Sequence, residues 1–553
     1  MKKNFKGWLP FLFCVLLFGV PSSLAQLAPP AIFYADLDSG PNTGGENNNG
    51  AIVTIYGSRF GATQGSSMVT VGGGGVAAYK LWSDSKVAFA LGSAAQTGNI
   101  VINVGGQASN GVSFTVRAGN IYSVSTSGND SNSGAFPSSC WAGIRKAVAT
   151  IAAGDIAYIL NGVNIIGLDN YNSTLWLGDS GSGTAASPKA LVGYPGAAVT
   201  VGSPTDQSIG IRGSNFHSPN DYWVIAGLSV RGHDSAYDTG GVNGWKVVAN
   251  DMACPNGAGQ TACFHSDTTI NMKFYGNYVH DVGTTAGSID KYYHAVYFTT
   301  NSNHIDVGWN TIVPNNVKST TSGGCRALQF YSTGGNDQFD LHVHDNVIHD
   351  AICDGINFAT VNADSGTVEA YNNVVYHVGT GPDPGDGSAN YSCINIASSA
   401  SRTNAVQIYN NTLYDCGSRG TADSGAVAPS VKTVMTNNLV SQLTAESFLN
   451  PNVGGGSLGG SNNLWYGAGA APSQTTANLT TNPLFVSLAV LDLHLQATSP
   501  AIDAGKTLAL STDIGGIKRP QAAGFDIGAY EYFSGGSTVQ RPNPPTNLSV
   551  IVK

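Results

Sequence analysis

A five-residue phrase recurs four times between residues 294 and 396, and no other feature constrains the fold of this chain as strongly. The copies are His294-Ala-Val-Tyr-Phe298, Arg326-Ala-Leu-Gln-Phe330, Asp354-Gly-Ile-Asn-Phe358 and Ser392-Cys-Ile-Asn-Ile396. Apolar and polar residues alternate within each copy, which is the pattern of a short strand with one apolar and one polar side. The copies follow one another at roughly 25 to 38 residues, without helical periodicity between them. This repeat predicts a solenoid whose coils bury their apolar sides against one another.

A second repeated position supports the same architecture. After each phrase another apolar alternation ends in an asparagine, and these asparagines are predicted to form an internal ladder at one bend of the coil. Its members are Asn277, Asn310, Asn346, Asn373, Asn411, Asn438 and Asn463. Residues 120–535, which contain both repeats, resemble the right-handed parallel β-helix proteins, the superfamily of pectate lyases and related polysaccharide-active proteins. The resemblance implies a right-handed parallel β-helix that acts on a polysaccharide.

Residues 27–117 are predicted to form a separate β-sandwich. Short alternating segments such as Val53-Thr-Ile-Tyr-Gly57 and Met68-Val-Thr-Val71 occur at the spacing of sandwich strands. With the closing segment Gly111-Val-Ser-Phe-Thr-Val116, this part resembles the immunoglobulin-like IPT/TIG domains, which implies a spacing or binding role without chemistry. The whole chain is therefore predicted to be all-β, an expectation that agrees with its 71 glycines and 11% charged residues.

The two ends of the chain have their own composition. Residues 1–25 have the lysines, the apolar run and the small-residue site of a secretory signal, so cleavage is expected near Ala25 and the protein is expected to be secreted by a bacterium. No later segment reaches the about eighteen consecutive apolar residues of a membrane-spanning helix, so no membrane span is expected. Residues 536–553 are predicted to be a proline-rich tail.

Charge and cysteines limit the partners and the compartment. The formal net charge of −9 argues against nucleic acid as a partner, and an acidic polysaccharide would require a local cluster of cations. Cys325 and Cys353 each precede a copy of the phrase, so stacking would place them about 5 Å apart, within reach of a disulfide. Cys254 and Cys263 are expected to close a small loop, as befits an oxidising compartment.

Some segments depart from the repeat. Residues 141–151 have helical spacing and are predicted to cover the first coil, and the tail at 499–531 is expected to seal the last one. Residues 251–268 and 378–391 are interpreted as insertions that form the walls of a cleft. The pair in His342-Val-His344 is predicted to lie on a solvated face rather than to bind a metal.

One predicted column contains groups suited to acid–base chemistry. The first residues of the four phrases are His294, Arg326, Asp354 and Ser392. The resemblance implies cleavage of uronate linkages by β-elimination, which requires a neutralised carboxylate, a base and an acid. Arg326 would then neutralise the carboxylate, Lys291 or His294 would be the base, and Tyr297 the acid. Asp354 completes this predicted catalytic set.

The neighbouring polar column is expected to bind the sugar. Gln329, Asn357 and Asn395 belong to it, and Tyr331 lies one residue beyond its strand. Calcium is an alternative means of neutralising the substrate, held by Asp354 with Asp383 or Asp386, and it would reconcile the acidic chain with an acidic substrate.

Two other functions remain open. Asp354 paired with Asp383 or Asp386 would suit a glycoside hydrolase, whose two carboxylates flank the bond that is cleaved. A non-catalytic carbohydrate-binding or surface adhesion protein would use the same polar columns without chemistry. In each case the partner is a polysaccharide, and a monomer is expected.

Overall fold

The computed structural model describes Met1 and residues 28–535, except residues 206–208, 284–288, 316–322, 334, 382–390, 418–423, 445, 452 and 454–457. The predicted signal segment and the proline-rich tail lie outside the described residues. So do Asp383 and Asp386, and therefore most of the second predicted insertion.

The N-terminal part is a β-sandwich, as predicted. One sheet has the order β1 (Ala31–Ala35), β3 (Ile52–Ser58), β7 (Lys86–Ala90) and β6 (Ala78–Trp82). The facing sheet has the order β2 (Ser39–Gly40), β10 (Val112–Val116), β8 (Gly98–Val104), β4 (Met68–Val71) and β5 (Gly74–Gly75), and β9 (Gln107–Ala108) pairs with β8. The alternation that marks these strands in the sequence buries side chains such as Val53, Ile55, Phe89 and Phe114 between the two sheets.

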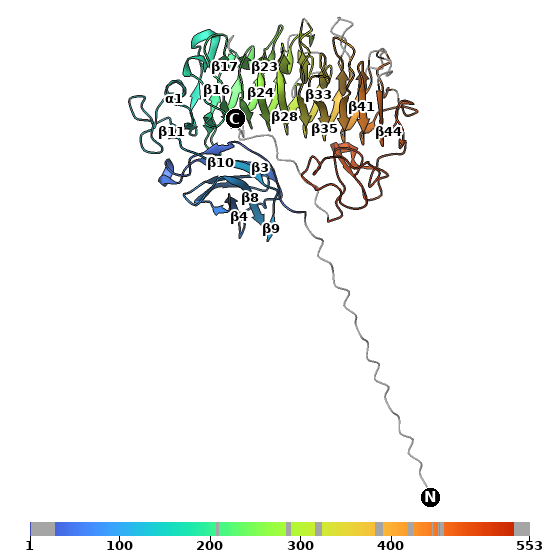
Figure 1. Ribbon diagram of the computed structural model, residues 1–553, viewed down its shortest axis with the longest axis horizontal. Coiled ribbons are helices and arrows are strands. Elements are labelled where there is room, and N and C mark those ends of the chain that lie inside the picture. The colour runs from blue at the N-terminus through green and yellow to red at the C-terminus, as the bar shows by residue number, and fades with distance from the viewer. Residues whose placement is uncertain are drawn as a thin grey trace.

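The following residues form a right-handed parallel β-helix, in which each coil contributes a strand to three long sheets (Figure 1). The first sheet contains β11 (Ile121–Val124), β12 (Ile156–Ile159), β15 (Lys189–Gly193), β18 (Trp223–Ala226), β21 (Lys246–Val248), β24 (Ile270–Tyr275), β28 (Asn303–Gly308), β32 (Leu341–His344), β35 (Val368–Tyr371), β38 (Val406–Tyr409), β41 (Thr433–Thr436) and β43 (Leu458–Ser461). The second sheet contains β13 (Asn164–Ile165), β16 (Thr200–Val201), β19 (Ser229–Arg231), β22 (Asp251–Cys254), β25 (Tyr278–Val282), β29 (Thr311–Val313), β33 (Val347–Ala351), β36 (Val374–Val378), β39 (Thr412–Cys416), β42 (Leu439–Ser441) and β44 (Leu464–Tyr466). The third sheet contains β14 (Ser173–Trp176), β17 (Ile209–Ser214), β20 (Ser235–Gly240), β23 (Ala262–Asp267), β27 (His294–Thr299), β31 (Leu328–Tyr331), β34 (Ile356–Phe358), β37 (Ile394–Ile396) and β40 (Val427–Pro429). The fold expectation is thus confirmed.

The repeated phrase has the predicted orientation. Val296, Leu328, Ile356 and Ile394 are register partners on successive strands of the third sheet, and all are fully buried in the core of the solenoid. Each strand therefore buries its apolar positions against the coils before and after it.

The asparagine ladder is also present. The amide oxygen of Asn346 accepts hydrogen bonds from the backbone and the side chain of Asn310, at 3.0 and 2.9 Å, and the same pattern links the other predicted members. Asn250 extends the ladder by one coil. The residue before the ladder position has a positive φ, for example 52° at Asp345 and 51° at Asn372, a conformation that Asp and Asn tolerate better than most residues. This explains the Asn-Asn and Asp-Asn pairs in the sequence.

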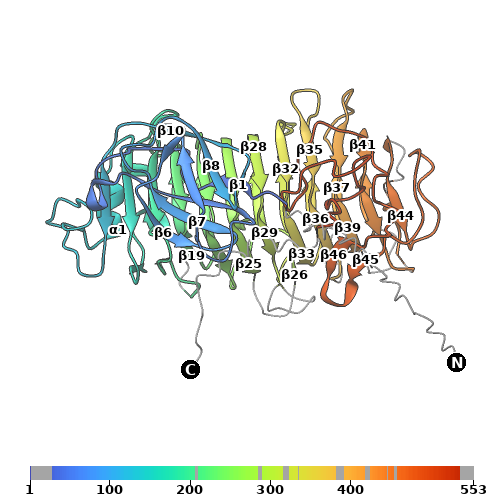
Figure 2. The ribbon, with the colours of Figure 1, turned by 90° about the horizontal axis from the view of Figure 1, so that it is seen from below.

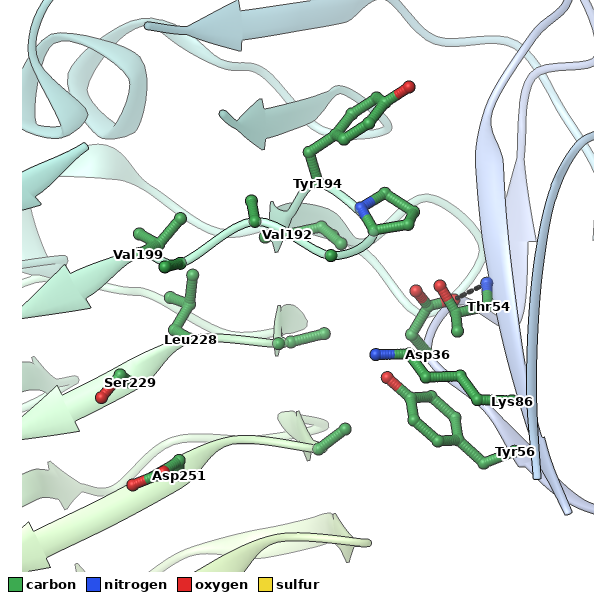
Figure 3. Close-up of a pocket in the computed structure, with 18 residues that line it drawn as sticks. Asp36, Thr54, Tyr56, Lys86, Val192, Tyr194, Val199, Leu228, Ser229 and Asp251 are labelled. Carbon is green, nitrogen blue, oxygen red and sulfur yellow. Dashed lines mark hydrogen bonds between the residues drawn. The ribbon is translucent and has the colours of Figure 1, made fainter. Parts of the chain in front are cut away.

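Two parts of the chain pack on the outside of the solenoid (Figure 2). The sandwich lies against the first sheet, where Val224, Ala226 and Val248 join its hydrophobic core. Figure 3 shows part of this interface, a narrow crevice in which Asp36, Thr54, Tyr56 and Lys86 of the sandwich face the coils around Val192 and Leu228. Burial raises the pKa of Asp36 to about 6, against the lowering effect of the N–H groups of Thr54 and Leu37.

The C-terminal segment takes a different position from the predicted one. Residues 485–530, which include β45 (Phe485–Ser487) and β46 (Asp492–Leu495), fold back over the second sheet and pack on Val374, Tyr414, Leu439 and Leu464. The last coil is instead extended by Thr476 and Leu479, which hydrogen-bond to Gly460 and Asn463. Arg59 of the sandwich donates hydrogen bonds to the carbonyl oxygens of Gly515 and Gly516, at 3.0 and 2.8 Å, so the two outer parts of the chain touch.

The predicted helix and disulfides are present, but one predicted insertion is not. The helix α1 (Ile144–Thr150) lies beside β11 at the first coil. The predicted disulfides Cys254–Cys263 and Cys325–Cys353 are present, together with Cys393–Cys416, and the described Cys140 is a buried free thiol. The predicted insertion at 251–268 is wrong, because most of it belongs to β22 and β23 and only residues 255–261 leave the coil. Over the described residues, no helix has the length and apolarity needed to cross a membrane.

Candidate functional site

Neither outer module packs its hydrophobic core on the third sheet. In Figure 1, β17 and β23 lie on the side away from the sandwich strands β3 and β10. Successive strands pair in parallel register, so residues from neighbouring coils form rows along this face at a spacing of about 4.8 Å. One row consists of Arg212, Asp238, His265, Tyr297, Gln329, Asn357 and Asn395.

The first three members of this row are joined by polar contacts. Arg212 Nε lies 3.0 Å from Asp238 Oδ2, and His265 Nδ1 lies 2.9 Å from Asp238 Oδ1. Burial alone would raise the pKa of Asp238, but the hydrogen bond from His265 and the charges of His265 and Arg212 hold it below its usual value. The carboxylate is therefore ionised, and it orients His265 with its Nδ1–H toward Asp238 and leaves Nε2 to accept a proton.

Tyr297 continues the row on the next coil. Its ring packs edge-on against His265, with centroids 5.6 Å apart, and against His294, at 5.2 Å. Burial raises the pKa of the Tyr297 hydroxyl, although hydrogen bonds from Thr299 and Gln329 act in the opposite direction. The hydroxyl is thus protonated at neutral pH and available as a proton donor.

The structure brings together the predicted column of His294, Arg326 and Asp354. Arg326 Nε donates to Asp354 Oδ2 at 3.1 Å, and Arg326 Nη1 lies 3.4 Å from the carbonyl oxygen of Lys291. The Nζ atom of Lys291 lies 4.6 Å from the centroid of the Tyr292 ring. These predicted residues therefore lie close together at the third sheet.

Burial limits what this column can do. Asp354 is fully buried and His294 is only 2% exposed, while the Arg326 side chain is 12% exposed. Burial raises the pKa of Asp354 to about 6 in spite of the charge of Arg326. Burial, and then the charges of Arg326 and His265, lower the pKa of His294 far below its usual value, so this ring is neutral. A sugar would reach Tyr297 and the edge of Arg326 before it reached His294 or Asp354.

The predicted binding residues divide into two kinds. Asn357 donates to Gln329 at 2.9 Å and Asn395 donates to Asn357 at 2.7 Å, and these three amides are 2% to 6% exposed. They form a ladder on the outer face and bind chiefly one another. Tyr331, in contrast, is 37% exposed and presents its ring to solvent.

Metal ligands are not evident in the part of the chain that the structure describes. No group of three or more His, Cys, Asp and Glu side chains there is arranged to hold a metal ion. His342 pairs with Glu369 and Asp340 as a surface residue would, but His344 is buried, contrary to the prediction of a solvated face. Burial by itself would lower the pKa of His344, yet its contacts with Asp306 and Asp345, both 2.8 Å, raise it to about 10.

Arg212 and Asp238 were not predicted from the sequence, and His265 was predicted to lie in an insertion. A signal was present in the segments Ser235-Ala-Tyr-Asp-Thr-Gly240 and Ala262-Cys-Phe-His-Ser-Asp267. In each segment an inward aromatic is followed by a polar residue, as Val296 is followed by Tyr297, and the register pairs Tyr237 with Phe264 and Phe264 with Val296. These are variant copies of the same phrase.

Exposed aromatic side chains gather around this row. Among the described residues, the tyrosine, phenylalanine and tryptophan side chains with large exposed fractions are Tyr171, Phe216, Tyr292 and Tyr331, at 44%, 66%, 50% and 37%. Tyr171 and Tyr292 come just before β14 and β27, whereas Phe216 follows β17 and Tyr331 ends β31. All four therefore lie at the ends of third-sheet strands. They flank the polar row on both sides.

The sandwich matches a known domain family in sequence. Residues 39–116 match the family model described as the IPT/TIG domain, and the sandwich is a TIG domain, as predicted. No curated protein matches the chain in sequence.

Three of the solved structures that are similar to this chain are a pectate lyase, an alginate lyase and XylC. Pectate lyase Pel9A is 13% identical, with 74% of this chain and 96% of that chain covered and a TM-score of 0.41. An alginate lyase from Paenibacillus sp. str. FPU-7 is 13% identical, with 55% and 94% covered and a TM-score of 0.38. XylC in complex with xylose is 10% identical, with 74% and 98% covered and a TM-score of 0.42.

Proposed function

We propose that the chain binds a polysaccharide along the outer face of the third sheet and cleaves uronate linkages by β-elimination. The observation that carries the proposal is the row Arg212–Asp238–His265, in line with Tyr297 and flanked by exposed aromatic rings. Aromatic faces suit the apolar faces of sugar rings, and a line of acid, base and cation suits the chemistry of a uronate.

His265 is the base in this proposal. Its Nδ1–H is held by Asp238, so Nε2 has the free lone pair, and the neighbouring carboxylate stabilises the imidazolium that forms when Nε2 accepts a proton. The proton removed is the one on C5 of the uronate, beside the carboxylate group. The electron pair of this C–H bond becomes the C4–C5 double bond.

Tyr297 is the acid, because its raised pKa keeps the hydroxyl protonated. The bond between C4 and the glycosidic oxygen breaks, and Tyr297 donates its proton to that leaving oxygen. No water is added to the products, which are one chain with a new hydroxyl group and one with an unsaturated uronate. A proton from solvent then restores Tyr297, and His265 releases the proton it took.

Removal of the C5 proton requires a cation near the substrate carboxylate. Arg212 and Arg326 lie on opposite sides of the His265–Tyr297 pair in the third sheet. Arg326 is tied to the buried Asp354, whereas the Arg212 side chain is 29% exposed. We therefore assign this role to Arg212 and a structural role to Arg326.

The experiment measures the ultraviolet absorbance of the unsaturated product while the full chain acts on pectic, alginate-like and neutral glycans, with and without calcium. The variants His265→Gln and Tyr297→Phe should lose about 100-fold or more in kcat on the acidic glycan that is cleaved. Matched controls are His349→Gln and Tyr376→Phe, because His349 also pairs with an aspartate but lies on the second sheet. Activity that survives His265→Gln would contradict the assignment.

A binding function without catalysis is the second candidate, favoured by the four exposed aromatic residues. In the same experiment it would give retention of a glycan without an unsaturated product and without new reducing ends. New reducing ends alone would indicate a hydrolase.

A further inference from the structure

A second cleft, away from the third sheet, opens where the TIG domain meets the solenoid. Its volume is about 410 Å³, which is in the range of ligand sites, and such sites are common at domain interfaces. The TIG domain contributes residues of β1, β10 and the segment after β1, and the solenoid contributes residues of β21 and β24 together with Trp309, which follows β28. Neither part of the chain forms this cleft alone.

One wall of the cleft is aromatic and held in place. The rings of Phe33 and Trp309 are nearly parallel, at 7° and with centroids 6.4 Å apart, and both are partly exposed. Tyr275 and His344 pack edge-on against Trp309 at 5.2 and 4.6 Å, so the indole has little freedom to turn. A fixed aromatic surface binds the apolar face of a ring at little cost in side-chain entropy.

The floor of the cleft is positively charged in an otherwise acidic protein. Two lysines, Lys246 and Lys273, share the single carboxylate of Asp38. Lys246 is buried and also donates to the carbonyl oxygen of Ala35 at 2.8 Å. The Lys273 side chain is 49% exposed, and its Nζ lies 3.4 Å from Asp38. Lys273 is therefore the cation that a ligand can reach.

The carboxylate next to Lys273 in its row has partners of its own. Asp306 follows Lys273 in the same row of the first sheet. Its partners are Tyr275 and the buried His344, whose pKa of about 10 keeps it positive. His344 is also shared with Asp345, so the attraction for an anion rests on the open ammonium group of Lys273 itself.

Strand β10 of the TIG domain supplies hydroxyl groups to the cleft. Ser113 and Thr115 are two residues apart on β10, both are exposed, and both line the cleft, whereas Phe114 between them points into the TIG core. Hydroxyl groups, an aromatic surface and one open ammonium group together match a polyhydroxylated ring that has a carboxylate.

We propose that this cleft is a second, non-catalytic binding site for an acidic sugar unit. The ring of the sugar would lie against Trp309, its carboxylate would meet Lys273, and its hydroxyl groups would meet Ser113 and Thr115. The choice of a uronate as the anion rests on the proposed function. The TIG domain then acts as half of an anchoring site that keeps a long polysaccharide on the enzyme.

The test uses calorimetric titration of the full chain with an acidic trisaccharide and with a neutral trisaccharide of equal length. The His265→Gln background prevents turnover of the sugar. Two binding events are expected for the acidic sugar. Adding Lys273→Gln should weaken one event about tenfold, and Ser113→Trp, which fills the cleft from the TIG side, should remove it. Lys432→Gln is the matched control, because Lys432 is an exposed lysine far along the solenoid that donates to Thr403.

The outcomes separate the two proposals. If Lys273→Gln and Ser113→Trp leave the titration unchanged, the second site is refuted whatever the catalytic assay shows. Equal binding of the neutral sugar, insensitive to Lys273→Gln, would refute the acidic ligand. In an otherwise wild-type chain, Ser113→Trp should raise KM for a long polymer and leave kcat unchanged. If no product is formed by the wild type but the cleft still binds, only the catalytic proposal fails.

Discussion

His265 Nδ1 lies 2.9 Å from Asp238 Oδ1, although 27 residues separate the two in the chain. Parallel register places them side by side, since Asp238 and His265 are partners on β20 and β23. The contact determines which ring nitrogen carries the hydrogen, and it leaves Nε2 for the substrate of the proposed reaction.

Replacing Asp238 tests this contact directly. In Asp238→Asn the side chain keeps its shape but loses the charge that stabilises an imidazolium on His265. We expect kcat to fall about 100-fold, and the acidic limb of the pH profile, which reports protonation of the base, should shift toward lower pH. Steady-state kinetics over a range of pH would measure both effects. An unchanged profile would mean that His265 does not titrate in catalysis.

We expect the Arg326–Asp354 pair to stabilise the folded chain. Asp354→Ala would leave a guanidinium group without its partner in a nearly closed environment, and we expect a loss of about 3 to 5 kcal/mol in the free energy of unfolding. Chemical denaturation measures the loss. The double variant Arg326→Met/Asp354→Leu removes both charges and should be much milder. If Asp354→Ala were fully stable but inactive, a catalytic role for this pair would be restored.

The asparagine ladder should be sensitive to single deletions. Asn346→Ala would remove the acceptor of the Asn310 N–H and the donor to the carbonyl oxygen of Val307, both buried. Each buried group left without a partner costs about 1 to 3 kcal/mol, so we expect the unfolding free energy to fall by about 3 kcal/mol or more. Asn164→Ala, at an exposed position, serves as the control and should cost about 1 kcal/mol or less.

Stability should also depend on the pH through Glu446. Burial, together with the adjacent Asp415, raises the pKa of Glu446 from 4.5 to about 8, and Asp415 Oδ2 also lies 3.3 Å from His377 Nε2. Because the folded state holds this proton more tightly than the unfolded state, its contribution is complete below pH 4.5 and disappears as the pH rises through about 8.

Thermal unfolding across this range would measure the effect. The midpoint of Glu446→Gln, which cannot ionise, should decline less with rising pH than that of the wild type. Parallel curves for the two proteins would contradict the shared proton between Glu446 and Asp415.

The repeat made the solenoid predictable because each coil repeats the same local pattern. The four phrases and the ladder asparagines identified strand, bend and stacking direction, and the disulfide between Cys325 and Cys353 followed from their equal positions in neighbouring coils. The fold of the TIG domain followed from its own strand alternation.

Only part of the candidate site could be predicted from the sequence, for a physical reason. The coils with Asp238 and His265 have an aromatic inward residue where the later phrase has Val296, and they have Thr239 and Ser266 where it has Phe298, so they do not look like copies of the later phrase. The predicted amides, Gln329 and Asn357, were correctly placed on the outer face, yet their mutual hydrogen bond depends on side-chain geometry rather than on pattern.

The position of the C-terminal segment has no local signal at all. It packs on residues of the second sheet such as Tyr414 and Leu439, whose alternation reports only that they lie on a face, not what covers it.

Arg59 connects the first and the last described parts of the chain by hydrogen bonds. Its guanidinium group binds the carbonyl oxygens of Pro29, at the start of the described chain, and of Gly515, near its end. A simple solenoid unravels from its ends one coil at a time, since each coil holds only its neighbours. Here the TIG domain packs on the early coils and contacts the C-terminal segment, which packs on the late coils, so fraying from one end is opposed by a module bound near the other.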